Sequence, residues 1–264
     1  VMTKTRLIPM AAAAMFAAAC SASSDTSPNN KQLDISTVLT QTSAGDPSAY
    51  AGVRTAWALP TASTSPTLPT SCAYSQADQR FDCAAVTVKG LTFTTSYYVL
   101  DASGASLTAP DATLAAAVRA VSDVTGTLDV SAAGSNQITI NKHSDLTLSG
   151  LLSGPRVLNG ASTEHDVITT TAGTVNTTSN IDLASTTSNL VLPSATTTKW
   201  PQSGSITSDM NTTTGIGSLP SITTKMHSVL TFNGTSIITI AMTISGQTLT
   251  CRVDLSGVTG PVCI

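Results

Sequence analysis

Apolar and polar residues alternate along much of this chain after Cys72, with the period of two expected for a β-strand that buries one face. The alternation is clearest over 238–244 and 249–255, and Asn233-Gly234 and Ser245-Gly246 are turn signals beside these runs. About ten such strands with tight turns predict a mainly β fold, an antiparallel meander that forms a sandwich, a barrel or a curved half-barrel.

Turn signals divide the middle of the chain. A strand is predicted over 91–100, followed by a turn at 101–104. Polar residues near His143 predict a turn between two short strands, and Asn159-Gly160 is a strong hairpin signal. Residues 184–220 are rich in Ser, Thr, Asn, Gly and Pro, so they are expected to be the least regular part of the fold.

One or two short helices are also predicted. Residues 46–59 place Tyr50, Val53 and Trp57 on one helical face before Pro60. Residues 111–124 combine helical spacing of their apolar positions with an aspartate that can cap the first turn, so a helix is predicted there, although flanking strands could make the segment extended.

Composition divides the chain into three parts. Residues 1–19 have the organisation of a secretory signal, and residues 20–71 are rich in Ser, Thr, Asn and Pro, as expected for a flexible tether with a possible short helix. Residues 72–264 contain the strand signals and are predicted to form one antiparallel β domain.

The N-terminal signal combines a basic start with a short apolar stretch. Lys4 and Arg6 precede the apolar run 7–19, which is too short to span a bilayer, and Cys20 follows Ala17-Ala18-Ala19. This arrangement resembles the lipobox-type signal peptide of a bacterial lipoprotein. Ala17-x-Ala19 also fits an ordinary small-x-small peptidase site, and both enzymes would cut before Cys20.

The resemblance implies a location and a membrane contact. In lipoproteins of this kind the cysteine carries several acyl chains, so Cys20 is expected to be lipidated and to hold the protein durably on a membrane. The residue after Cys20 is Ser21, and not the Asp usually involved in inner-membrane retention. The expected location is therefore the bacterial cell envelope, at the outer membrane.

The remaining four cysteines are expected to form two disulfides, because exported proteins meet an oxidising environment. Four cysteines allow three pairings. The short spacings favour Cys72-Cys83 and Cys251-Cys263, each closing one hairpin, and the first would place Tyr74 opposite Phe81. Neither spacing fits a Cys-x-x-Cys redox pair or a zinc site.

Charge is sparse. Only 10% of the residues are charged, and the net charge of −3 becomes −5 once Lys4 and Arg6 are removed with the signal. Basic stretches are absent, which makes nucleic acid an unexpected partner. Aromatic residues make up 4% of the chain, too few to suggest a stacking platform for sugars or bases.

No motif in the sequence specifies catalysis, a metal or a cofactor. Glu164-His165-Asp166 places three candidate ligands together, but neighbours on a strand point to opposite faces, so all three cannot meet one metal. His143, His165 and His227 are interpreted as solvated or locally hydrogen-bonded residues. Gly150–Gly154 has the wrong spacing for a serine nucleophile elbow and is interpreted as a turn.

These observations favour a non-enzymatic, β-rich envelope lipoprotein with a structural, adhesive or binding role, whose partner would be another envelope component. Two alternatives remain open at this stage. A curved sheet could carry a lipid or another apolar ligand, or the protein could be a secreted hydrolase with a pair of carboxylates or a Ser-His-Asp cluster that the sequence does not reveal.

Overall fold

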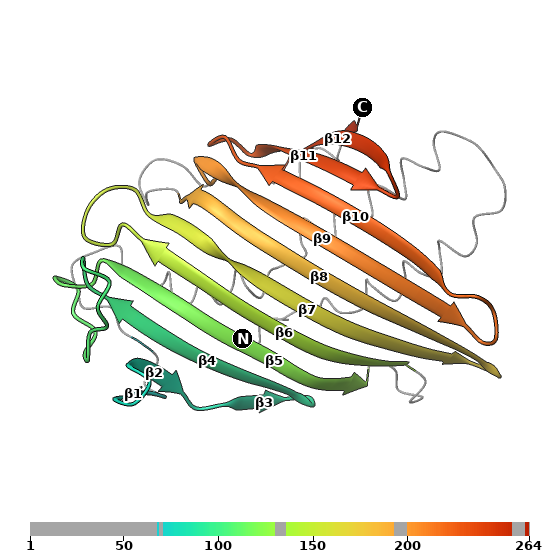
Figure 1. The fold of residues 1–264 in the computed structure, drawn as a ribbon, viewed down its shortest axis with the longest axis horizontal. Coiled ribbons are helices and arrows are strands. Elements are labelled where there is room, and N and C mark those ends of the chain that lie inside the picture. Colours follow the sequence, from blue (N-terminus) through green and yellow to red (C-terminus); the bar gives the residue numbers. More distant parts are fainter. Residues whose placement is uncertain (1–67, 69–70, 130–135, 193–199, 255–261, 264) are drawn as a thin grey trace, which may run out of the picture.

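The computed structural model describes residues 68, 71–129, 136–192, 200–254 and 262–263, and these form thirteen β-strands in one sheet (Figure 1). In chain order the strands are β1 (Cys72–Ser75), β2 (Arg80–Cys83), β3 (Val86–Val88), β4 (Leu91–Leu100), β5 (Ala117–Asp129), β6 (Asn136–Ser149), β7 (Val157–Ala172), β8 (Val175–Val191), β9 (Ser203–Ile216), β10 (Ile222–Thr231), β11 (Ile237–Ile244), β12 (Gln247–Asp254) and β13 (Val262–Cys263).

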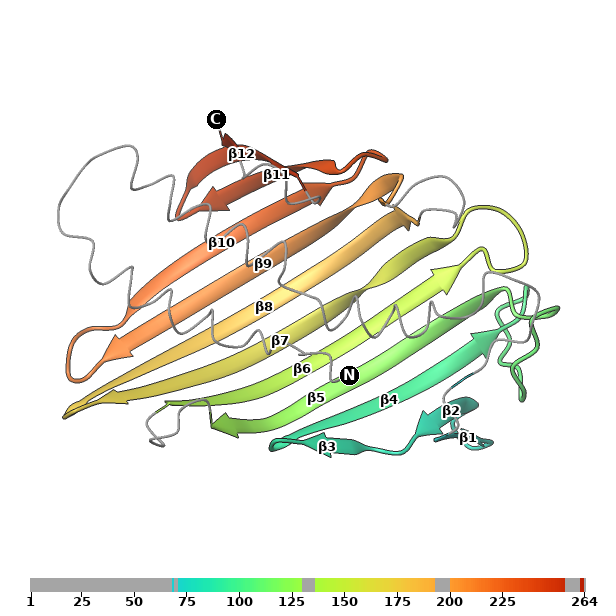
Figure 2. The ribbon, with the colours of Figure 1, turned by 180° about the vertical axis from the view of Figure 1, so that it is seen from behind.

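The strands pair in the order in which they occur in the chain. Each successive pair from β4 to β13 is antiparallel, β2 pairs directly with β4, and β3 pairs with β4 beside β2. The mainly β, antiparallel meander predicted from the sequence is therefore confirmed. The described strands form one open, twisted sheet, visible from both sides in Figures 1 and 2, and neither a two-sheet sandwich nor a closed barrel.

The helix predicted over 111–124 is wrong. Asp111 does accept a hydrogen bond from the backbone N–H of Thr113 (2.8 Å), and Ala115 donates to the Asp111 carbonyl (2.8 Å), but the turn ends there. Strand β5 begins at Ala117, because β4 and β6 offer backbone partners along both of its edges. The predicted helix at 46–59 lies outside the described residues.

The central strands are longer than the turn signals suggested. Polar residues around His143 lie within the continuous strand β6, so the turn predicted there is wrong. Asn159-Gly160 is also no hairpin, because β7 runs through it with a β-bulge between Leu158 and Gly160. Most of residues 184–220 belong to strands β8 and β9, contrary to the expectation of irregular structure.

One face of the sheet, called here the buried face, carries the apolar side chains. An apolar row crosses β4 to β8 in direct register and is at most 5% exposed; its members are Val99, Val118, Leu148, Leu158 and Leu190. A second apolar cluster lies on β10 to β12 around Ile238, Ile240 and Met242. The other face, called the exposed face, is rich in Thr, Asn, Asp and His.

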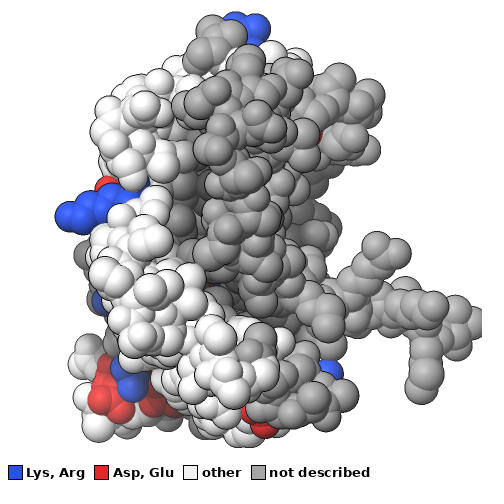
Figure 3. Space-filling model, turned by 90° about the vertical axis from the view of Figure 1, so that its right-hand side faces the viewer, with Lys and Arg blue, Asp and Glu red and all other residues white. Residues whose placement is uncertain are grey.

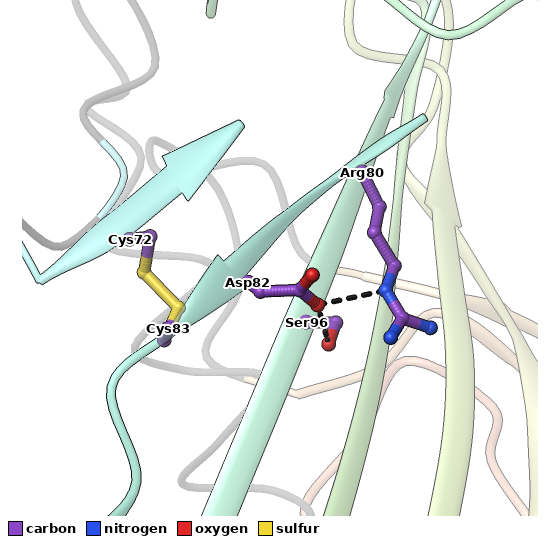
Figure 4. Close-up of a disulfide and its surroundings, with 5 residues drawn as sticks. All are labelled: Cys72, Arg80, Asp82, Cys83 and Ser96. Carbon is purple, nitrogen blue, oxygen red and sulfur yellow. Dashed lines mark hydrogen bonds and ion pairs between the residues drawn. A yellow bond between two sulfur atoms is a disulfide. The ribbon is translucent and has the colours of Figure 1, made fainter. Parts of the chain in front are cut away.

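At each end of the sheet, a disulfide joins the last two strands. Cys72 on β1 is bonded to Cys83 on β2, and Cys251 on β12 is bonded to Cys263 on β13, as the hairpin spacings predicted. Figure 4 shows the first bridge beside Asp82, whose carboxylate accepts hydrogen bonds from Arg80 (2.7 Å) and Ser96 (2.7 Å).

The register at the first bridge also agrees with the sequence. Tyr74 lies opposite Phe81, and the two rings meet edge to face with centroids 5.1 Å apart. Ring packing and the covalent bond thus hold the short strand β1 onto the sheet.

Candidate functional site

A groove of about 1110 Å³ crosses the exposed face from β6 to β11. One wall is a row of residues in direct register: His143, Thr163, Ala184, Asp209 and His227. The other wall lies two residues further along each strand: Asn141, His165, Asp182, Asn211 and Lys225. Because side chains alternate between faces, the residue between the two walls on each strand contributes its backbone to the floor.

The groove collects all three histidines of the chain, and each is fixed by an aspartate on a neighbouring strand. The Nδ1 atoms of His143, His165 and His227 lie 2.7 Å from an oxygen of Asp123, Asp182 and Asp209, respectively. The three imidazoles are about half exposed. The interpretation of the histidines as locally hydrogen-bonded agrees with this geometry.

The centre of the groove is lined by small side chains. Thr163 and Ala184 lie side by side on β7 and β8, and both are exposed. The larger His143 and the His227–Asp209 pair stand on either side of them in the same row. Small residues between large polar ones leave an open space bordered by hydrogen-bonding groups.

An ion pair lies next to the groove on the same face. Arg119 donates from Nε to Asp145 (2.8 Å), and the guanidinium also lies 5.0 Å from the ring centre of Tyr98. The hydrogen bond from Arg119 lowers the pKa of Asp145. These two charges neutralise each other and add little to the net charge of the surface.

The buried face has a different polar cluster. Lys142 on β6 lies 3.1 Å from Glu164 on β7, and Asp166 follows two residues later on the same face. Burial raises the pKa of Asp166 to about 7, and the adjacent carboxylate of Glu164 contributes further to the rise. Glu164 and Asp166 therefore lie on the face opposite His165, as the alternation predicted for Glu164-His165-Asp166.

Hydroxyl groups surround this cluster. A row of serines crosses β5 to β10 in direct register on the buried face: Ser122, Ser144, Ser162, Ser185, Ser208 and Ser228. Within it, the Oγ atoms of Ser162 and Ser185 are 2.8 Å apart. Ser162 and Ser185 thus satisfy part of their hydrogen bonding through each other.

The groove offers hydrogen-bonding and charged groups to a ligand. Among the described residues, each of the three imidazoles is hydrogen-bonded to an aspartate carboxylate, and none is bonded to a serine, threonine or cysteine. Among the described residues, no group of three or more His, Cys, Asp or Glu side chains is placed to hold a metal ion. Gly150–Gly154 lies in the connection from β6 to β7, as the predicted turn requires.

Sequence reasoning identified the histidines but not the groove. The residues that form its walls occur as polar pairs two positions apart, at 141 and 143, 163 and 165, 209 and 211, and 225 and 227. That spacing indicates a shared face, but it does not say which strands are neighbours. Cys20, the predicted lipidation site, lies outside the described residues.

The described part of the chain contains no helix with the length and apolar character needed to cross a membrane. No family model, no curated protein and no solved structure matches the chain. The chemistry of the groove and of the Lys142–Glu164–Asp166 cluster is therefore the basis for a functional interpretation.

Proposed function

We propose that this protein is an exported, membrane-anchored binding protein of the bacterial cell envelope, and that it binds its partner through the groove on the exposed face. The observation that supports this best is the convergence of three Asp-fixed histidines, together with Asn141, Asn211 and Lys225, in one open groove. Side chains held in place by neighbours lose little conformational freedom when a ligand binds, which favours recognition.

The chemistry of the groove favours binding over the two alternatives. A glycosidase would use two free carboxyl groups, whereas the carboxylates that line the groove, Asp182 and Asp209, are each bound to a histidine (2.7 Å). An apolar carrier would need an open apolar cavity, whereas the groove is bordered by Asp, Asn, His and Thr. A polar partner fits this surface better than a lipid.

Export and anchoring are supported by different observations. The two disulfides indicate an oxidising environment, as outside the cytoplasm. Anchoring rests on the resemblance of the leader to a lipobox ending at Cys20. Mass spectrometry of the mature protein is expected to show an acylated N-terminal cysteine, and Cys20→Ser is expected to abolish the acylation.

Binding is tested by filling the groove. Ala184→Trp adds a large side chain to one wall at the centre of the groove and removes no hydrogen-bonding side chain. Ala241→Trp is the matched control, because Ala241 is also exposed, on strand β11, and does not line the groove. The lipid-free chain (Cys20→Ser) is expected to sediment with isolated cell envelopes, and only Ala184→Trp should abolish this.

The outcome that would contradict the proposal is equally specific. Equal sedimentation of the two tryptophan variants, with both folded by circular dichroism, would show that the groove is not the binding surface.

A further inference from the structure

The unoccupied hydrogen-bonding positions in the groove are mainly acceptors. Asp182 and Asp209, which line the groove, each use Oδ1 for a histidine, as does Asp123 beside the groove on β5. Oδ2 of these aspartates has no hydrogen bond to another described residue. Asn211 lines the groove, and its Oδ1 is a buried acceptor without a hydrogen-bond partner among the described residues. A ligand that satisfies the free carboxylate oxygens has to supply donors.

The histidines add further acceptors at neutral pH. An ionised carboxylate only accepts hydrogen bonds, so the Nδ1 atom beside each aspartate carries the proton. In a neutral imidazole this leaves the lone pair on Nε2. The aspartates thus select one tautomer, in which the outer nitrogen of His143, His165 and His227 accepts.

The charges in the groove also favour a ligand of this kind, one that is positively charged. With neutral imidazoles, Asp182 and Asp209 outnumber Lys225 within the groove, and Asp123 lies beside it on β5. The nearby Asp145 is neutralised by Arg119. The groove is therefore negative at neutral pH. Only 10% of all residues in the chain are charged, and Figure 3 shows the charged side chains that are visible from one side.

We infer that the groove binds a ligand carrying several ammonium groups along an extended chain, and that it releases this ligand on acidification. The inference rests on the proposed function and names the chemistry of its partner. Ammonium groups are donors without acceptors, and they carry the charge that the groove lacks. The groove crosses six strands about 4.8 Å apart, a length that suits a chain better than a single small ion.

Acidification changes both the hydrogen-bonding character of the histidines and the net charge of the groove. Protonation of a histidine turns Nε2 from an acceptor into a donor and adds a positive charge. Asp123 on β5 and Thr163 on β7 flank His143, and Asp145 lies two residues along β6. Three such protonations would convert a negative groove into a positive one.

The surroundings of the other two histidines are similar. His165 has Asn141 on β6 and Asp182 on β8 as its cross-strand neighbours. His227 has Asp209 on β9 and Thr243 on β11, and Lys225 lies two residues along β10. Each histidine thus has one carboxylate as a direct cross-strand neighbour. Acidification adds positive charge at all three histidines.

The test uses pentalysine and spermine as probes, each measured by isothermal titration calorimetry with the lipid-free chain. Lysine ammonium groups stay charged between about pH 7.5 and pH 5.5, so a change in affinity for pentalysine reports on the protein. Affinity is expected to fall about tenfold on acidification and to fall with added salt. Acetylated pentalysine, which has no side-chain charge, is expected not to bind.

Two sets of variants localise the effect. Asp182→Asn with Asp209→Asn should weaken binding about tenfold at pH 7.5. Asp78→Asn with Asp129→Asn changes the net charge equally outside the groove and should leave binding unchanged. Replacing all three histidines by asparagine should remove the pH dependence, because asparagine can still donate to the aspartates but does not titrate.

The outcomes separate this inference from the proposed function. Binding of pentalysine alone would assign a peptide source, and binding of spermine would assign a polyamine. Equal binding of acetylated and free pentalysine, or a pH dependence that survives in the histidine variant, would overturn the inference. If neither probe binds while Ala184→Trp still abolishes envelope sedimentation, the inference fails and the proposed function stands.

Discussion

Lys142 Nζ lies 3.1 Å from a carboxylate oxygen of Glu164, the only glutamate in the chain, and joins β6 to β7 on the buried face. The lysine side chain is 9% exposed and the glutamate 22%. A charge this deeply buried depends strongly on its partner, because water no longer solvates it.

Glu164→Gln is therefore expected to destabilise the protein by about 3 kcal/mol, since it removes the carboxylate from a buried ammonium group. Lys142→Met combined with Glu164→Leu should recover most of the loss, because neither charge then remains. Asp145→Asn is the control: its pair with Arg119 is more exposed and should cost less than about 1 kcal/mol. Urea unfolding measures all three, and equal losses for the two single variants would contradict the burial effect.

The raised pKa of Asp166 predicts that the stability of the protein depends on pH. Burial raises its pKa from 3.8 to about 7 in the folded protein. Between these values the folded state holds a proton that the unfolded state releases, so the free energy of unfolding should fall as pH rises from about 4 to 7. The expected loss is on the order of 2 kcal/mol, less than the full pKa difference implies because water still reaches part of the carboxyl group.

Asp166→Asn removes this titration while keeping the shape of the protonated side chain. The variant should show a flatter pH profile and exceed the parent protein in stability above about pH 7. Denaturant unfolding at several pH values measures the difference. An unchanged slope in the variant would show that Asp166 is not the group responsible.

The two disulfides are expected to protect the ends of the sheet. Replacing Cys251 and Cys263 by alanine should lower stability by about 3 kcal/mol, since the bridge closes a loop with a sequence separation of 12. Hydrogen exchange should accelerate in β12 and β13 first, because an edge strand has a neighbour on one side only. The central strands β6 to β8 serve as an internal control, and faster exchange there instead would contradict an edge-specific role.

Gly160 is expected to tolerate no side chain. It lies at the β-bulge of β7 with φ +148°, and an added Cβ would lie 2.1 Å from the backbone oxygen of Asp145 on the neighbouring strand. Gly160→Ala should cost at least about 2 kcal/mol. At Gly215 on β9 an added Cβ would lie 3.4 Å from its nearest neighbour, so Gly215→Ala should have little effect. Thermal unfolding of the two variants measures the difference.

The bulge at Gly160 and the strand through His143 show why local signals failed in the middle of the chain. Asn-Gly and clusters of polar residues favour turns in isolation. Here β6 and β7 have neighbours on both sides, so their backbone groups are paired along nearly their whole length. The same long-range pairing made residues 117–124 extended in spite of their helical spacing.

The sequence by itself determined the β class and the antiparallel meander, because alternation and tight turns are properties of short segments. Cysteine spacing favoured the two pairs that the structure shows, but it did not exclude the other pairings. Only the tertiary structure decided that His143, His165 and His227 share one groove and that Lys142 meets Glu164. These relationships depend on the register of strands β5 to β10, where a shift by one residue would move every side chain to the other face. Register is set by the sum of many contacts between strands, and no single segment contains that information.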